Sequence, residues 1–216
     1  MSPVAVFWFG IIAAIIYLPF SENPPNWGRS LAKTVPLIAL TAAAWMAGGP
    51  LLLVLALALS ALGDFALSRP GMRPFIAGLV AFAAAHVFYL ILFTALSGRG
   101  PYMALVDQPL LALFLGWVAI SAEIWLVPHT GPTLRWPVRV YVLTITLMAL
   151  AALTLPLGAV AIGAVYFVAS DVILAYRNFR MEPDDPLSGR AGWLLWGLYI
   201  TGQALILVGV LNIAAA

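Results

Sequence analysis

Apolar segments of bilayer-spanning length take up most of this chain. A helix needs about 20 predominantly apolar residues to cross the hydrocarbon core of a membrane. Eight segments fit this requirement: residues 4–20, 31–47, 50–67, 74–96, 108–127, 136–154, 156–177 and 191–213. A soluble domain of 216 residues has no means of burying a chain that is 64% hydrophobic and 8% charged. We therefore predict an all-α polytopic membrane protein, a bundle of eight transmembrane helices that forms one domain over residues 1–216.

The rest of the composition argues against several other classes of protein. The absence of cysteine excludes disulfides and thiolate chemistry. The Lys and Arg residues form no basic run outside short loops, so nucleic-acid binding has no support. No positively charged stretch precedes the apolar segment that starts at Val4, so we interpret this segment as a retained helix and not a cleaved signal.

Basic residues are distributed unequally between the predicted loops. Arg99 alone lies in an even-numbered loop, and the other nine lie in or beside the odd-numbered loops. These nine are Arg29, Lys33, Arg69, Arg73, Arg135, Arg139, Arg177, Arg180 and Arg190. Because loops rich in Lys and Arg stay in the cytoplasm, we expect the odd-numbered loops there and both termini on the opposite side. Short loops and this charge bias are typical of a bacterial inner-membrane protein.

Two aspartates lie inside the apolar segments in matching local contexts. They occur in Gly-Asp64-Phe-Ala-Leu and in Ser-Asp171-Val-Ile-Leu. Asp64 lies five residues before Arg69 and Asp171 six residues before Arg177. At 1.5 Å per residue, both lie roughly 8–9 Å from the cytoplasmic ends of their helices, in one layer. Ionisable residues in a membrane are costly and mark functional sites by default, so we predict a catalytic pair. The structural alternative is that each pairs with its arginine.

Other polar residues lie on the predicted helices at several depths below the cytoplasmic side. Glu123 and Lys33 lie near cytoplasmic helix ends, Tyr141 lies at least one turn into its helix, and His86 and Gln203 lie about 18 Å deep. We predict that these five residues line one cavity open toward the cytoplasmic leaflet. Alternatively, Glu123 is a solvated helix-end charge, Lys33 only determines topology, and the other three are interhelical hydrogen-bonding residues.

Two further histidine observations bear on the site. His129 lies in a predicted loop and receives no role. Because only one histidine lies inside the predicted bundle, we expect no metal site, although Asp64, Asp171 and His86 together are a conceivable ligand set.

A close carboxylate pair suits acid–base chemistry. Two carboxylates in a low dielectric do not easily ionise together, so one keeps its proton and the other stays charged. One pocket then holds a general acid and a general base, as in glycoside hydrolysis through an oxocarbenium-like transition state. The sequence contains no Gly-x-Ser-x-Gly elbow and no His-Glu-x-x-His motif. Serine-type and zinc-type lipid hydrolysis therefore have little support.

Four short motifs, in a fixed order, resemble those of a known family. They are Ser60-Ala-Leu-Gly-Asp64-Phe-Ala-Leu67, His86-Val-Phe-Tyr89, Gly163-Ala-Val-Tyr-Phe-Val-Ala-Ser-Asp171-Val-Ile-Leu-Ala175 and Tyr199-Ile-Thr-Gly-Gln203-Ala-Leu-Ile206. Together they resemble the YhhN-like lysoplasmalogenase family of eight-helix membrane proteins. Lys33 with Pro36 is similar to the family's Lys-Pro element, although two residues intervene here.

The resemblance implies hydrolysis of the vinyl ether bond of lysoplasmalogens, without a cofactor. The products are a fatty aldehyde and a glycerophospho-ethanolamine or -choline. One of Asp64 and Asp171 would donate the proton, and the other would stabilise the cation and activate water. Lys33 would bind the substrate phosphate. His86, Tyr141, Ser170 and Gln203 would orient the water, the acid or the ether oxygen. Together with Lys33, Ser60, Tyr89 and Glu123, they are the predicted substrate-binding residues. The implied partners are the lysolipid substrate and membrane lipids, and the sequence identifies no oligomeric partner.

Three other functions fit the same intramembrane residues. A small transporter or proton-coupled carrier would use the aspartates and His86 as a proton relay. A different lipid hydrolase would turn over saturated lysolipids. A non-enzymatic lipid-binding protein would tolerate the substitution Asp64→Asn.

Overall fold

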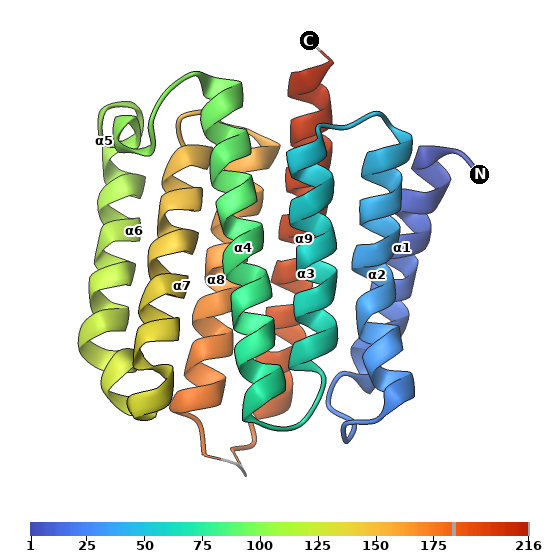
Figure 1. Cartoon of the computed structure of the whole chain (residues 1–216), viewed down its shortest axis with the longest axis vertical. Helices are drawn as coiled ribbons and strands as arrows, with labels where there is room; N and C mark the ends of the chain where they lie inside the picture. Colours follow the sequence, from blue (N-terminus) through green and yellow to red (C-terminus); the bar gives the residue numbers. More distant parts are fainter. Residues whose placement is uncertain (183–184, 216) are drawn as a thin grey trace.

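The computed structural model describes residues 1–182 and 185–215, and its regular secondary structure is helical throughout these residues. The long helices are α1 (Pro3–Tyr17), α2 (Trp27–Met46), α3 (Leu51–Leu67), α4 (Met72–Ser97), α6 (Pro109–Ser121), α7 (Gly131–Ala152), α8 (Ala159–Phe179) and α9 (Ser188–Ala214). Short helical turns are η1 (Leu18–Phe20), η2 (Pro101–Met103) and α5 (Ala104–Asp107). Each of the eight predicted segments overlaps one long helix (Figure 1). The prediction of an all-α fold is confirmed.

Six helical stretches are long and apolar enough to cross a membrane. They are Pro3–Phe20, Met72–Ser97, Pro109–His129, Gly131–Ala152, Ala159–Phe179 and Ser188–Ala214. Helix α3 is apolar but has only 17 residues. Helix α2 is not among the six, and its first half carries Arg29 and Lys33. The chain is a multi-pass integral membrane protein, and the count of eight crossings stays a prediction.

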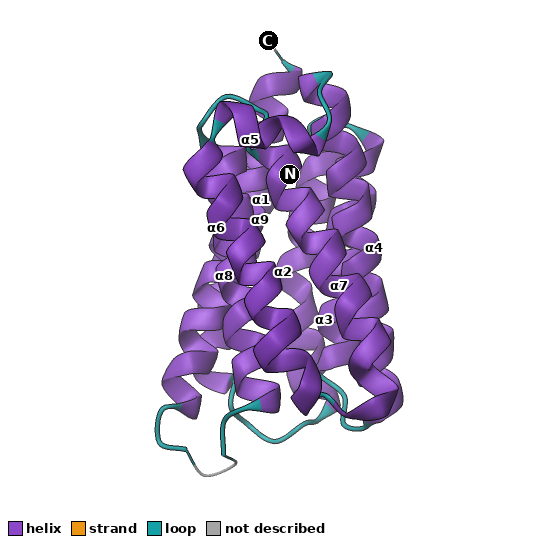
Figure 2. Ribbon diagram, turned by 90° about the vertical axis from the view of Figure 1, so that its left-hand side faces the viewer, coloured by secondary structure: helices purple, strands orange, loops and turns teal. Residues whose placement is uncertain are grey.

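The helices lie roughly along one direction, with both chain termini at the same end (Figure 1). The connections between α1 and α2, α3 and α4, and α6 and α7 lie at the opposite end, where α8 also ends. The most extensive helix contacts join α8 to α9, α3 to α4, and α1 to α2, and α4 also packs on α7. Figure 2 shows the bundle from the side of α6. Both termini lie at one end of the bundle, as predicted for helices that alternate in direction. Which end faces the cytoplasm stays a prediction.

Glycines allow close contact at the helix pairs that carry the polar residues. A Cβ atom added at Gly163 of α8 would lie 2.7 Å from the carbonyl oxygen of Gly202 on α9, and one added at Gly202 would lie 2.8 Å from that of Gly163. A Cβ atom added at Gly63 of α3 would lie 2.6 Å from the ring of Phe82 on α4. Small residues let membrane helices approach this closely. Gly63 and Gly202 therefore set the contacts immediately beside Asp64 and Gln203.

Helix α6 does not continue as a regular α-helix to the end of the predicted segment. Residues Ala122–Leu126 form a π-helical turn, η3, and Val127–His129 form a 3-10 turn, η4. In a regular α-helix the ring of Pro128 would clash with the carbonyl group of Ile124, four residues earlier. The wider turn relieves this conflict. Single π-helical turns of this kind often occur at functional sites.

Candidate active site

Asp64, on α3, is a buried carboxylate held from two sides. Its side chain is 3% exposed. The Tyr199 hydroxyl of α9 donates a hydrogen bond of 2.8 Å to Asp64 Oδ2, and Lys33 Nζ of α2 lies 3.3 Å from Asp64 Oδ1. Lys33 therefore forms an ion pair with a predicted catalytic acid. Tyr199 is not among the residues predicted from the sequence, although its position one helical turn before Gln203 places it on the same helix face.

A second set of hydrogen bonds lies one helical turn away from Asp64. Gln203 Nε2 donates to Ser60 Oγ at 3.0 Å, and the Tyr89 hydroxyl donates to Gln203 Oε1 at 2.6 Å. These three side chains are fully buried. Because α3 and α9 run in opposite directions, Ser60 faces Gln203 just as Asp64 faces Tyr199. The structure thus brings Ser60, Tyr89 and Gln203 together in one network beside Asp64.

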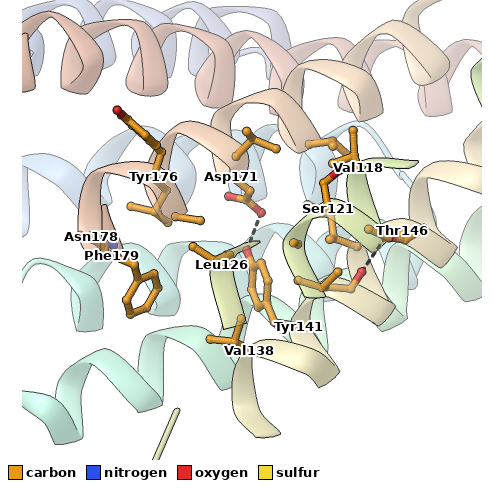
Figure 3. A pocket seen from close by; sticks show the side chains of 18 of the residues that line it. Val118, Ser121, Leu126, Val138, Tyr141, Thr146, Asp171, Tyr176, Asn178 and Phe179 are labelled. Atoms are coloured by element: carbon orange, nitrogen blue, oxygen red, sulfur yellow. Dashed lines mark hydrogen bonds between the residues drawn. The ribbon is translucent and has the colours of Figure 1, made fainter. Parts of the chain in front are cut away.

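Asp171, on α8, is more accessible than Asp64. The residue is half-buried, and its carboxylate accepts a hydrogen bond of 2.6 Å from the Tyr141 hydroxyl of α7 (Figure 3). The arginines of the structural alternative have other partners: Arg69 lies over the Trp27 ring, and Arg177 pairs with Glu22 at 2.5 Å. Salt bridges to these arginines therefore do not account for the two aspartates.

A row of rings connects the two aspartate–tyrosine units. The ring centroids of Tyr199 and Phe167 are 5.4 Å apart, those of Phe167 and His86 are 4.9 Å apart, and those of His86 and Tyr141 are 5.1 Å apart. His86 is fully buried, and neither of its ring nitrogens has a hydrogen-bond partner among the described residues. The hydrogen bonds found in residues 1–182 and 185–215 do not join the two carboxylates directly. Their action as a pair stays a prediction.

A cavity of about 250 Å³ reaches Asp171. Its lining comes from α4, α6, η3, α7 and α8, with one residue of α3, and is mostly hydrocarbon and aromatic. Asp171 and Tyr141 lie on its wall, between Val118 and Thr146 on one side and Tyr176 and Phe179 on the other (Figure 3). Asp64 is not among the lining residues. The two predicted catalytic residues therefore differ in access, since Asp171 faces the cavity and Asp64 lies behind the row of rings.

Of the eight predicted substrate-binding residues, only Tyr141 lines this cavity. The residues that do not line it are Lys33, Ser60, His86, Tyr89, Glu123, Ser170 and Gln203. Glu123, in η3, is exposed and pairs with Arg139 of α7 at 2.5 Å, which matches the alternative of a solvated helix-end charge. The Ser170 hydroxyl donates to the Phe167 carbonyl of its own helix at 2.7 Å. Neither residue lines the cavity around Asp171. In the part of the chain that the structure describes, no group of three or more His, Cys, Asp or Glu residues is arranged to hold a metal ion.

A sequence model of the YhhN family matches residues 28–210, a range that includes every residue of the site described above. The chain belongs to the YhhN family. The similarity seen in the sequence motifs is thereby confirmed. Among curated proteins, the chain is 28% identical over 219 residues to the lysoplasmalogenase TMEM86B of Homo sapiens, covering 94% of this chain and 84% of the human protein.

Other YhhN relatives have similar levels of identity. The lysoplasmalogenase TMEM86B of Sus scrofa is 31% identical over 207 residues, covering 94% of this chain and 84% of that protein. The lysoplasmalogenase of Mycobacterium bovis is 31% identical over 163 residues, covering 73% of this chain and 59% of the mycobacterial protein. No solved structure matches the chain significantly.

Proposed function

We propose that this protein is a lysoplasmalogenase, which hydrolyses the vinyl ether bond of a lysoplasmalogen to a fatty aldehyde and a glycerophospho-ethanolamine or -choline. One observation carries the proposal: Asp171, held by Tyr141, is the acidic group on the wall of a mostly apolar cavity inside a membrane protein. The curated relatives named lysoplasmalogenase, which match most of the chain, support the same activity.

The cavity suits a lipid with a single hydrocarbon chain. Leu115, Val118, Ile145 and Val168 line its part deeper in the bundle, and burial of a hydrocarbon chain against such side chains is favourable in proportion to the area removed from water. A volume of about 250 Å³ favours one chain over two. We therefore place the alkenyl chain here and the vinyl ether beside Asp171.

Vinyl ether cleavage needs a proton donor and a water molecule. A proton added to the β-carbon turns the carbon–carbon double bond into a single bond and leaves an oxocarbenium ion. Water adds to the cationic carbon and loses a proton, which gives a hemiacetal. The hemiacetal hydroxyl then loses its proton as the bond to the glycerol oxygen breaks. The glycerol oxygen takes up a proton and leaves as an alcohol, while the chain leaves as an aldehyde. The donor thus regains the proton that it gave, and one water molecule is consumed.

Asp171 is our candidate for the acid. It lies on the cavity wall where substrate is reachable, and no Lys or Arg of the described residues lies within ion-pair distance of it. The Tyr141 hydroxyl fixes one carboxyl oxygen and leaves the other for the substrate. A positioned acid of this kind contributes about 10²–10⁴-fold to a reaction rate.

We assign the complementary role to Asp64. Lys33 and Tyr199 stabilise it as a carboxylate, and its negative charge favours an oxocarbenium ion in the low-dielectric interior. His86, with two ring nitrogens free of hydrogen bonds among the described residues, lies between the two aspartate–tyrosine units and is our candidate for orienting the attacking water.

The proposal is tested with purified protein and three lysolipids that differ only at the first carbon of the glycerol: vinyl ether, alkyl ether and acyl ester. We expect aldehyde from the vinyl ether and no product from the other two. Fatty acid from the acyl ester, or cleavage of the alkyl ether, would instead indicate a different lipid hydrolase. No product from any of the three, together with proton flux in proteoliposomes, would overturn the proposal in favour of a carrier.

A further inference from the structure

The cavity is open on the side that faces membrane lipid. Four of its lining residues are also exposed on the outer surface: Trp117 of α6, Trp125 of η3, and Val172 and Tyr176 of α8 have exposed fractions between 43% and 62%. They belong to the membrane-spanning stretches Pro109–His129 and Ala159–Phe179. A surface exposed there contacts lipid, so the cavity meets the bilayer between η3 and α8.

Two stacked rings form the edges of this opening. Trp125 comes from η3 and Tyr176 from α8, and their ring centroids lie 5.8 Å apart with an interplanar angle of 9°. Both rings also line the cavity. Only a side-chain contact closes the opening at this point, and its η3 side is a π-helical turn in place of regular α-helix.

A positive charge lies directly at the opening. The Arg180 guanidinium, at the end of α8, lies 4.6 Å from the centroid of the Trp125 ring. His129 Nδ1 lies 2.9 Å from the Trp125 carbonyl oxygen, and His129 Nε2 contacts Arg180 Nη1. Because a carbonyl oxygen only accepts, we place the imidazole hydrogen on Nδ1, and Nε2 then accepts from Arg180. In this arrangement His129 holds the guanidinium over the Trp125 ring.

Arg180 differs from the arginines that form ion pairs. Arg99, Arg139 and Arg177 pair with Asp107, Glu123 and Glu22, respectively. Within residues 1–182 and 185–215, no acidic side chain lies within ion-pair distance of Arg180. A guanidinium offers a planar fork of N–H donors that matches a phosphate group.

The spacing along α8 fits a glycerophospholipid. The Tyr176 ring is stacked on the Trp125 ring, which also contacts the Arg180 guanidinium. Tyr176 lies five residues after Asp171, a distance of about 7–8 Å along the helix. This separation is comparable with the three-carbon glycerol bridge between a vinyl ether oxygen and a phosphate. Lys33, the residue predicted from sequence to bind the phosphate, pairs with Asp64 and does not line the cavity.

We propose that the lysolipid enters sideways from the membrane between Trp125 and Tyr176, and that Arg180, held by His129, binds its phosphate at this opening. The proposal rests on the proposed function, since it places the ether bond at Asp171. Arg180 and His129 then form the binding site for the phosphate group of the lysolipid.

The phosphate site is tested by removing the charge from the protein and from the substrate in turn. Arg180→Gln is compared with Arg180→Lys and with Arg69→Gln, a matched control because Arg69 lies over the Trp27 ring, away from the cavity. The substrates are a vinyl ether lysolipid and the corresponding alkenylglycerol, which lacks the phosphate. For the lysolipid, we expect Arg180→Gln to raise KM about tenfold or more with little change in kcat, Arg180→Lys to recover part of the loss, and Arg69→Gln to behave like wild type. For the alkenylglycerol, we expect wild type and Arg180→Gln to be equal.

Each outcome of this comparison decides between named alternatives. An equal effect of Arg180→Gln on both substrates would overturn the phosphate site, because the loss would then be structural. Binding of inorganic phosphate to wild type, lost in Arg180→Gln, together with equal wild-type KM values for the lysolipid and the alkenylglycerol, would assign the site to free phosphate and not to the lysolipid headgroup. Absence of aldehyde from wild-type protein with either substrate would be a failure of the proposed function itself.

The sideways route is tested with introduced thiols, because the chain has no cysteine of its own. The double variant Trp125→Cys/Tyr176→Cys is treated with a short reducible bis-thiol cross-linker. The control is Trp27→Cys/Phe65→Cys, whose native rings lie 6.0 Å apart and do not line the cavity. We expect cross-linking of the first pair to abolish aldehyde release and reduction to restore it, each relative to the same untreated variant, with no change for the control pair. Full turnover by the cross-linked first pair would overturn this route.

Discussion

The ion pair between Lys33 and Asp64 leads to a prediction that separates stability from catalysis. Lys33 is 17% exposed and Asp64 is 3% exposed, so the pair is largely removed from solvent. In Lys33→Met, the Asp64 carboxylate keeps the hydrogen bond from Tyr199 and loses its cation. Breaking a buried pair costs about 3–5 kcal/mol. We expect about 3 kcal/mol here, since Tyr199 still donates to Asp64.

The expected loss is measurable by thermal unfolding in detergent. A chain of this size loses about 2–4 °C in Tm per kcal/mol, so Lys33→Met should melt about 6–12 °C lower than wild type. The double variant Lys33→Met/Asp64→Asn removes both charges and should recover most of this loss, because replacing a whole buried pair by neutral groups is often close to neutral. Because Asp64 is assigned a catalytic role, we expect the double variant to release no aldehyde even though its Tm is restored.

Two results would refute this reasoning. A Tm for Lys33→Met within about 1 °C of wild type would mean that the ion pair contributes little to stability. Full aldehyde release by the folded double variant would mean that Asp64 is a structural carboxylate, and its assigned role would fall.

Further predictions concern the helix contacts and the cavity. Gly202→Ala should lower the free energy of unfolding by about 1–3 kcal/mol, because its Cβ atom would lie 2.8 Å from a backbone oxygen of α8. Gly197→Ala on the same helix meets nothing within 4 Å and should be neutral or stabilising, and thermal unfolding of both variants tests this difference. Tyr141→Phe should lower kcat about 10–100-fold, since it removes the hydrogen bond to Asp171, and steady-state kinetics measures the loss. Val118→Trp should fill the deeper part of the cavity and shift the preference toward shorter alkenyl chains about tenfold, as ratios of kcat/KM over a chain-length series will show. Glu123→Gln should leave aldehyde release within about twofold of wild type, because the side chain is exposed and lies outside the cavity around Asp171.

The positions of the helices were predictable because hydrophobicity over about 20 residues is a local property. Each predicted segment overlaps one long helix, and the shared layer of Asp64 and Asp171 was inferred by counting residues along their helices. The π-helical turn was not predicted, although Pro128 at the end of an apolar segment was a local signal for it.

The partners of the site residues were not predictable from one sequence. Residue counting gives depth in the membrane but not the rotation of each helix about its axis, and the rotation depends on packing at contacts such as Gly163 with Gly202. Counting therefore gave the depth of Asp64 but not its hydrogen bond to Tyr199. It also assigned Glu123 to the cavity, although this side chain pairs with Arg139. The opening between η3 and α8 has no signature in the sequence, because it depends on residues from separate helices.

The most direct test concerns the proton that starts the reaction. Wild-type protein and Asp171→Asn are each incubated with the vinyl ether lysolipid in D₂O, and the aldehyde is quantified by mass spectrometry. We expect wild type to release aldehyde with one deuterium on the carbon next to the carbonyl, and Asp171→Asn, folded as judged by its Tm, to be slower by about 10²–10⁴-fold. Aldehyde release by folded Asp171→Asn within a few-fold of the wild-type rate would contradict the assignment of Asp171 as the acid.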